Sequence, residues 1–201
     1  MTAGGDPARK VESETDEVLV AAIARGDAAA FRLITDAYLM AVHRLAARML
    51  KDSNEAEEVA QDTFLKLWTH ASRWRPASND TLVLPWLRSL AMNACIDRLR
   101  RRRFDSGGEV PERADEAPSA AEQIDQCRLG ALVSSALHSL PARQRAAIVL
   151  TYYEDLPNVE AAEALNLHLK AFESLLFRAR HALKATLVDR GIGADDLRKV
   201  A

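Results

Sequence analysis

The sequence has few of the features that would mark a disulfide framework, a membrane span or a β-rich fold. It holds two cysteines, Cys95 and Cys127, and no Cys-x-x-Cys pair. We therefore expect neither a disulfide nor a zinc framework and interpret both thiols as buried apolar groups. No apolar run approaches the roughly 20 residues of a membrane span and the N-terminus is polar, which predicts a cytoplasmic protein without membrane insertion. Aromatics make up 5% of the residues, Gly and Pro are sparse, and abundant Leu, Ala, Arg and Glu predict an all-α fold.

Motifs that are typical of enzymes are also missing. No Glu-x-x-His pair is present to build a di-iron site in a helical bundle. The sequence has neither a Gly-rich phosphate loop nor a nucleophile elbow. We therefore expect a protein that is not an enzyme and that holds no metal or cofactor.

The net charge of -2 hides an uneven distribution. Residues 104–125 hold 7 acidic side chains and 1 basic one, and they are rich in Gly, Pro, Ala and Ser, which is typical of a flexible linker. Residues 15–103 hold 14 basic and 11 acidic side chains, and residues 126–187 hold 7 and 5. The chain is thus predicted to form two small helical domains, 15–103 and 126–187, joined by an acidic linker, with a disordered tail 1–14 and a frayed tail 188–201.

Local signals predict the helices of the first domain. A short helix stops at Gly26, Asp27 caps a long helix, and Asn54 caps the next helix, which runs to about Ala71. Pro85 opens a further helix that ends near Arg103. Apolar residues at three- and four-residue steps are expected to face a core: Phe31, Ile34, Tyr38, Val42, Leu45 and Met49, then Ala60, Phe64, Leu67, Trp68 and Ala71, then Leu87, Leu90, Ala91, Ala94 and Cys95.

The helix after Asn54 also carries the polar side chains Glu58, Gln61 and Asp62 in its N-terminal half. Acids near a helix N-terminus suit the helix dipole, so this is either a plain solvated face or a docking face for a basic partner.

The loop before Pro85 and the helix after it suggest contact with nucleic acid. Trp74 stands beside Arg75 and could stack on an unpaired base, or it could lie on the core. The helix then presents Trp86 and Asn93 towards one side. The strongest basic cluster of the chain follows Trp86 and Asn93 and comprises Arg98, Arg100, Arg101, Arg102 and Arg103. These arginines could hold phosphates, or they could have a purely structural role, because cations favour a helix C-terminus. Asp97 is expected to brace Arg98 or Arg101.

Residues 158–184 have the pattern of a helix-turn-helix. A helix over 158–165 is followed by Asn166, which tolerates the left-handed backbone of a tight turn. A second helix starts near His168, and Leu169, Phe172, Leu176 and Ala179 are expected at helical spacing on its apolar face. The outward face of this second helix comprises His168, Lys170, Glu173, Ser174, Phe177, Arg178 and Arg180. This face could enter a major groove of DNA, or the two helices could form an ordinary helical hairpin. Helices before this motif are expected from the periodic Leu129, Leu132, Val133, Leu137 and Leu140, and from Pro141 with Ile148, Val149 and Tyr152 on an apolar side.

Several pieces of sequence follow one another over residues 16–187 in an order that makes a chance match implausible. They are Gly26, Asp27 and Phe31; Ala56 to Phe64 with Trp68; Trp86, Leu87, Asn93 and Asp97; Leu140, Pro141 and Arg143 to Arg145; Tyr152 to Glu154; and Glu173 to Arg180. In this combination the chain resembles a bacterial RNA polymerase sigma factor of the sigma-70 family, group IV, the extracytoplasmic-function (ECF) type.

The resemblance implies a region 2 domain that binds core polymerase and the promoter -10 element, and a region 4 domain that binds the -35 element. It implies that Glu58, Gln61 and Asp62 dock on the β′ clamp helices, and that the β flap is a further polymerase contact. Loop 73–82 and Asn93 would capture a flipped base of the -10 strand. The -10 surface implied in this way comprises Trp74, Arg75, Asn79, Trp86, Asn93, Arg98, Arg100 and Arg101. An anti-sigma factor is an implied partner.

The chain departs from the family pattern at three places. The loop before Trp86 is about three residues longer than usual, and Pro157 and His168 replace the usual helix caps. Glu173 stands where many relatives have a basic residue, and it could accept from a cytosine amino group or pair with Lys170 or Arg178. Two other functions fit less of the chain: a sigma mimic that sequesters an anti-sigma factor, and a simple helix-turn-helix repressor.

Overall fold

The computed structural model describes residues 16–74, 82–105 and 123–191. These residues are helical or lie in turns, and no strand occurs among them. Contacts divide the chain into a first unit, Met1–Cys95, and a second unit, Ile96–Ala201. Arg75, Asn79 and the predicted tail 1–14 lie outside the described residues, as do most of the predicted linker and most of the predicted tail 188–201.

The first unit begins with a helix over 16–23 that ends before Gly26, whose φ of +88° is a conformation that glycine adopts easily. Asp27 then caps α2 (Ala28–Met49), because its carboxylate accepts from the N–H groups of Ala29 and Ala30 at 2.8 and 3.1 Å. This cap was predicted and is confirmed.

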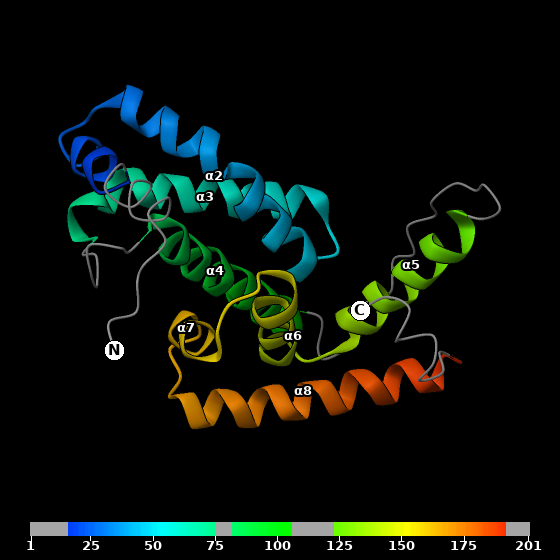
Figure 1. Cartoon of the computed structure of the whole chain (residues 1–201). Coiled ribbons are helices and arrows are strands. Elements are labelled where there is room, and N and C mark those ends of the chain that lie inside the picture. Colours follow the sequence, from blue (N-terminus) through cyan, green and yellow to red (C-terminus); the bar gives the residue numbers. More distant parts are fainter. Residues whose placement is uncertain (1–15, 75–81, 106–122, 192–201) are drawn as a thin grey trace. The chain divides into compact units, whose positions relative to one another are not determined.

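Helix α3 (Ser53–His70) runs antiparallel to α2 (Figure 1). Its N-cap is Asp52, whose carboxylate accepts from the N–H groups of Asn54 and Glu55 at 2.8 and 3.2 Å. The predicted cap, Asn54, is therefore wrong by two residues, because Asp and Asn compete for the same role over three positions.

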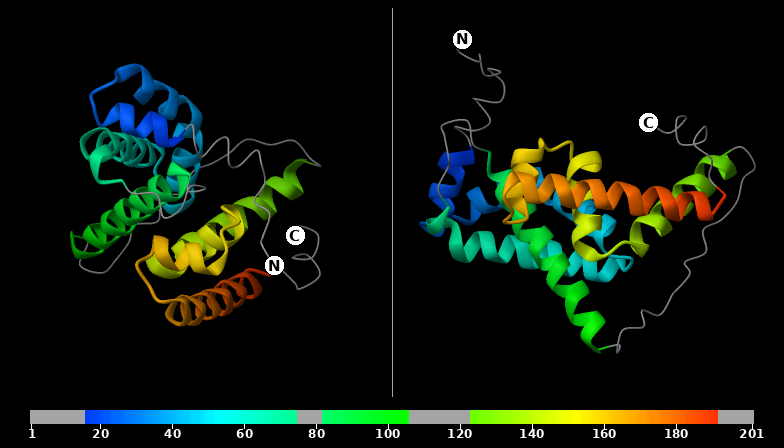
Figure 2. Two further views of the ribbon diagram at one scale, coloured as in Figure 1. Left: turned by 60° about the vertical axis from the view of Figure 1, so that its left-hand side comes forward. Right: turned by 90° about the horizontal axis from the view of Figure 1, so that it is seen from below.

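The core of the first unit is made by one face of each long helix. In α2 and α3 the buried side chains include Ile34, Val42, Leu45, Met49, Val59, Phe64 and Leu67. Helix α4 (Val83–Asp105), which crosses α3 in Figures 1 and 2, buries Leu87, Ala91 and Cys95. The burial of Cys95 confirms its predicted apolar role, whereas the side chain of Cys127 lies outside the described part.

One tryptophan differs from the sequence prediction, and another takes one of the two placements that the sequence left open. Trp68, expected in the core, is 37% exposed, and its ring makes an edge contact with Phe31 at 5.2 Å between centroids. Trp74, expected either on the surface or on the core, is only 8% exposed and follows the 3₁₀ turn Ala71–Arg73. Periodicity places residues on a helix face, but neighbouring elements decide how much of a large ring they cover.

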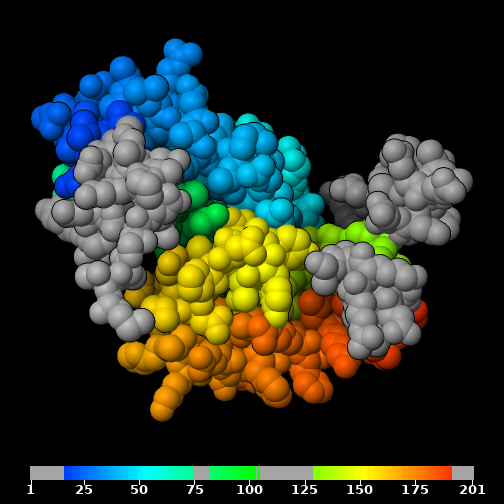
Figure 3. Space-filling model, in the orientation of Figure 1, coloured from blue at the N-terminus to red at the C-terminus, as the bar shows by residue number. Residues whose placement is uncertain are grey.

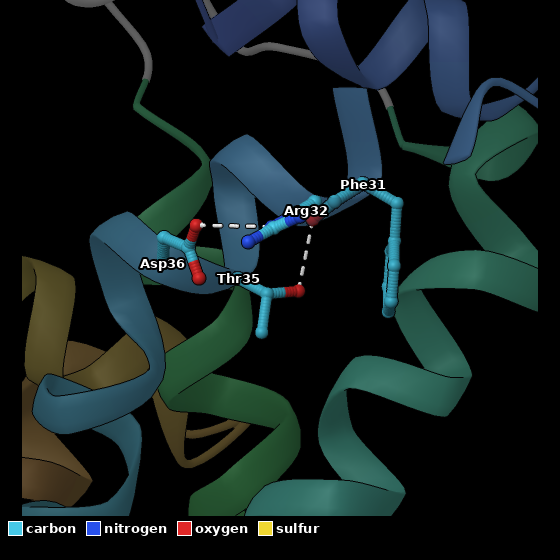
Figure 4. A network of polar contacts seen from close by, with 4 residues as sticks. All are labelled: Phe31, Arg32, Thr35 and Asp36. Carbon is cyan, nitrogen blue, oxygen red and sulfur yellow. Dashed lines mark hydrogen bonds and ion pairs between the residues drawn. The ribbon is translucent and has the colours of Figure 1, made fainter. Parts of the chain in front are cut away.

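Figure 4 shows how α2 separates its two faces. The Phe31 ring points towards α3, where it also makes an edge contact with Phe64 at 6.5 Å. On the other side Arg32 and Asp36 form an exposed ion pair at 3.8 Å. Thr35 satisfies its hydroxyl by donating to the carbonyl of Phe31 at 2.9 Å.

The second unit contains α5 (Gln123–Ser139), α6 (Ala142–Ile148), a π-helical turn (Val149–Tyr153), α7 (Asn158–Ala164) and α8 (Leu169–Asp189). Compared with the predicted bounds, α4 extends two residues past Arg103, α5 starts three residues before 126 and α8 ends two residues past 187. Hydrophobic periodicity marks helix interiors and leaves polar end turns undetermined.

The helix-turn-helix is formed by α7 and α8. Asn166 has a φ of 51° in the turn between them, as predicted. Phe172, Leu176 and Ala179 are buried on the inner face of α8, also as predicted. Three expected core residues are instead exposed: Leu132 at 38%, Tyr152 at 53% and Leu169 at 39%. Tyr152 lies in the π-helical turn, which shifts the helical register on which its prediction depended.

Candidate nucleic-acid interface

The polar face of α3 lies at the surface of the first unit. Glu58, Gln61 and Asp62 are exposed, while Val59, Ala60 and Thr63 between them are buried. The Gln61 amide donates to the Glu57 carboxylate at 3.2 Å, one turn away. One side of α3 therefore packs into the core, and its opposite side presents mostly acidic side chains to solvent.

Helix α4 carries the residues predicted for strand capture. Trp86, Asn93 and Arg98 are partly buried, whereas Arg100 and Arg101 are exposed. Part of each partly buried side chain therefore remains accessible to solvent.

The ion pair of Asp97 differs from the prediction, which named Arg98 or Arg101 as the partner. Its carboxylate pairs with the Arg100 guanidinium at 3.2 Å, three residues along the helix. Positions three and four residues away both lie next to Asp97, so spacing alone cannot choose between Arg100 and Arg101.

The burial of Trp74 agrees with the second of its two predicted placements, on the core. A ring that is 8% exposed cannot offer its face to a base without leaving the core. Arg75 and Asn79 lie outside the described residues. Among the aromatic candidates, Trp86 in the first turn of α4 is thus the ring that remains accessible.

The outer face of α8 gathers the residues predicted for the second interface. His168, the N-cap, and Lys170, Glu173, Ser174, Phe177, Arg178 and Arg180 are all exposed. In the space-filling view the side chains of α8, drawn orange, stand open to solvent along the helix (Figure 3). Both views of Figure 2 show α8 as one unbroken helix, long enough to carry these residues on a single straight face.

Several of these side chains are oriented by neighbours. The Phe177 ring contacts the His181 ring at 5.8 Å between centroids. The Arg178 Nε donates to the Ser174 carbonyl at 3.3 Å, and the Arg180 guanidinium lies 5.3 Å from the centre of the Tyr152 ring. Such contacts reduce the side-chain entropy that binding would otherwise remove.

Two arginines that the sequence analysis did not assign to a structural role support the motif. Arg143 donates from Nη2 to the carbonyl of Leu165 at 3.2 Å, at the C-cap of α7. Arg145, only 7% exposed, donates to the carbonyls of His138 and Leu140 at the end of α5. Both satisfy carbonyls that helix ends leave without intrahelical partners. Their contacts span 5 to 22 residues, so no local pattern reveals them.

In the described part of the chain, no group of three or more His, Cys, Asp or Glu side chains could hold a metal ion. None of the helices described there is long and apolar enough to cross a membrane.

Family models of known proteins match two stretches of the chain. The family model for sigma-70 region 2 matches residues 34–104, and that for sigma-70 region 4 matches residues 131–183. The ECF RNA polymerase sigma factor SigM of Bacillus subtilis is 31% identical over 161 residues, which cover 77% of this chain and 93% of SigM. The chain belongs to the ECF sigma factors. It directs promoter-specific initiation of transcription.

Other relatives extend the match over nearly the whole length of this sigma factor. SigK of Mycobacterium sp. (strain KMS) is 30% identical over 195 residues, covering 93% of this chain and 98% of SigK. Among solved structures, CnrH in complex with the cytosolic domain of CnrY has a TM-score of 0.62 and 26% identity, over 87% of this chain and 98% of that one. The sigma factor RpoE of Bartonella quintana, solved with the anti-sigma factor NepR, has the same TM-score and identity, over 78% and 96%.

Proposed function

We propose that this sigma factor is a non-catalytic specificity subunit that acts in the cytoplasm and binds core polymerase through the acidic face of α3. The observation that carries the proposal is the exposure of Glu58, Gln61 and Asp62 on a helix whose opposite stripe fills the core. An exposed, mostly acidic face suits a basic partner, such as the β′ clamp helices, and charge complementarity would both steer and orient that encounter.

The -10 element is addressed by α4 in this proposal. Asn93 and Trp86 would hold an unpaired base of the -10 strand, with stacking and edge contacts offsetting the few kcal/mol that unstacking costs. Arg98, Arg100 and Arg101 would bind phosphates further along the same helix. The partial burial of Arg98 and the ion pair of Arg100 with Asp97 support a preformed surface.

The -35 element is addressed by α8. Its first half would lie in the major groove, and Arg178 and Arg180 would contact phosphates beside it. The tight turn at Asn166 supports this function, because it joins α7 directly to α8, and the Arg143–Leu165 hydrogen bond ties the end of α7 to α6.

An anti-sigma factor is the proposed regulator. RpoE was solved with an anti-sigma factor, and it resembles this chain over 96% of its own length. A partner that covers the acidic face of α3 would prevent polymerase binding by direct competition.

Reconstitution tests the proposed function. The purified full-length chain is added to core polymerase with fragmented genomic DNA, and transcript 5′ ends are mapped. We expect start sites that share two upstream elements and that vanish when the chain is omitted. Transcription that does not depend on the chain, or starts without a shared element, would overturn the proposal.

A further inference from the structure

Glu173 is the one carboxylate on the outer face of the first half of α8. It is the fifth residue of a helix that starts at Leu169, and its exposed neighbours Lys170, Ser174 and Phe177 lie within one turn. A carboxylate here would approach DNA whose phosphates repel it. It weakens binding to every sequence unless a particular sequence offers it a donor.

The two cations nearest in sequence do not neutralise Glu173. Among the described residues, no ion pair within 4.0 Å joins Glu173 to Lys170 or to Arg178, although the sequence allows both pairings. Arg178 instead donates from Nε to the Ser174 carbonyl at 3.3 Å. The Glu173 carboxylate is therefore available as a hydrogen-bond acceptor on the face that meets the groove.

The chemistry of the major groove restricts what an acceptor can bind. Guanine presents only acceptors there and thymine presents an acceptor and a methyl group, so both repel or ignore a carboxylate. Cytosine N4 and adenine N6 are donors, but adenine places the N7 acceptor beside N6. Cytosine carries a donor and no acceptor on its own major-groove edge and is the base that suits a carboxylate best.

We propose that Glu173 is a specificity-determining residue that accepts a hydrogen bond from the N4 amino group of a cytosine in the -35 element. This inference rests on the proposed function, in which the N-terminal half of α8 enters the major groove. The position supports it, because residues in the first turns of a recognition helix are those that reach base edges. Repulsion from the other bases makes the same side chain select against them.

The test uses holoenzyme formed from the full chain and core polymerase. Its substrate is a duplex library with a randomised -35 hexamer, built on a start site mapped in the reconstituted reaction, and transcribed templates are sequenced. Wild type, Glu173→Ala and Glu173→Gln are compared. Glu163→Gln serves as the matched control, because Glu163 is exposed on α7 and carries no proposed role.

We expect the wild type to prefer cytosine at one position by roughly 5- to 150-fold. Glu173→Ala should lose that preference and keep the others, Glu173→Gln should shift it towards adenine, and Glu163→Gln should match the wild type. An unchanged preference in Glu173→Ala would overturn the inference, as would a uniform rise in transcription from all sequences. If the wild type still selects particular -35 sequences, either of these results leaves the proposed function intact. If the wild type selects no -35 sequence at all, the assignment of α8 to the -35 element is overturned as well.

Discussion

The Asp16 carboxylate accepts a hydrogen bond from the backbone N–H of Val83 at 2.9 Å, across 67 residues of sequence. It also accepts from the Tyr38 hydroxyl, at 3.0 and 2.9 Å to its two oxygens. Asp16 is only 4% exposed. One buried carboxylate therefore ties the first helix to α2 and to the first residue of α4, the helix that carries Trp86 and Asn93.

Asp16→Ala is expected to lower the stability of the first unit by about 2–4 kcal/mol, because the buried N–H of Val83 and the half-buried hydroxyl of Tyr38 lose this acceptor. Trp68, Trp74 and Trp86, the three tryptophans of the chain, all lie in that unit, so denaturant unfolding followed by tryptophan fluorescence reports on it selectively. Asp36→Ala is the control. Its ion pair with Arg32 is between side chains that are 84% and 70% exposed, so no measurable loss is expected. Equal midpoints for Asp16→Ala and wild type would contradict the prediction.

Asn166→Ala is expected to loosen the turn between α7 and α8, because a φ of 51° costs alanine about 1 kcal/mol, whereas the short polar side chain of asparagine tolerates this conformation. Native-state hydrogen exchange should show faster exchange in peptides that cover α7 and α8 and no change in peptides that cover α2. Asn166→Gly should exchange like the wild type, since glycine adopts positive φ readily. Faster exchange in the glycine variant than in the alanine variant would show that the side chain, and not the backbone, matters.

Asn93→Ala is expected to reduce open-complex formation more than core binding, because its proposed partner is an unpaired base that appears only on melting. Permanganate reactivity of unpaired thymines measures the first quantity and a binding titration with core polymerase the second. Asn54→Ala, at an exposed position at the start of α3, should change neither. Equal losses of melting and core binding in Asn93→Ala would indicate misfolding instead.

Arg178→Ala is expected to weaken binding to all -35 sequences alike, and the slope of log K against log salt should fall by about one. The Arg178 Nε is bonded to its own helix, which leaves the end of the guanidinium for a phosphate. Titration of the holoenzyme with promoter duplexes at several salt concentrations gives the slope. A change of base preference at one position, with the slope unchanged, would assign Arg178 to base readout.

The sequence predicted those features that local chemistry determines. The cap at Asp27, the stop at Gly26 and the left-handed Asn166 each depend on a few neighbouring residues, and all three are confirmed. The all-α fold follows from composition and periodicity, and the family from an ordered set of short motifs.

The features that the sequence did not predict depend on contacts between distant segments. The roles of Asp16 and Arg143 depend on partners 67 and 22 residues away. The burial of Trp74 and the exposure of Tyr152 depend on how neighbouring elements pack. The polymerase and DNA roles of the site residues stay predictions, because exposure on a helix face does not identify what binds there.

The affinity of the full-length chain for core polymerase tests the central claim most directly. Gln61→Arg combined with Asp62→Arg places two positive charges on the acidic face of α3, where both residues are exposed, so the fold should be kept. We predict binding at least about tenfold weaker than wild type, because like charges would then face a basic partner, with wild-type affinity for the control Asp36→Arg on α2. An unchanged affinity in the double variant, or a wild type that does not bind core polymerase, would contradict the claim that this face holds the polymerase.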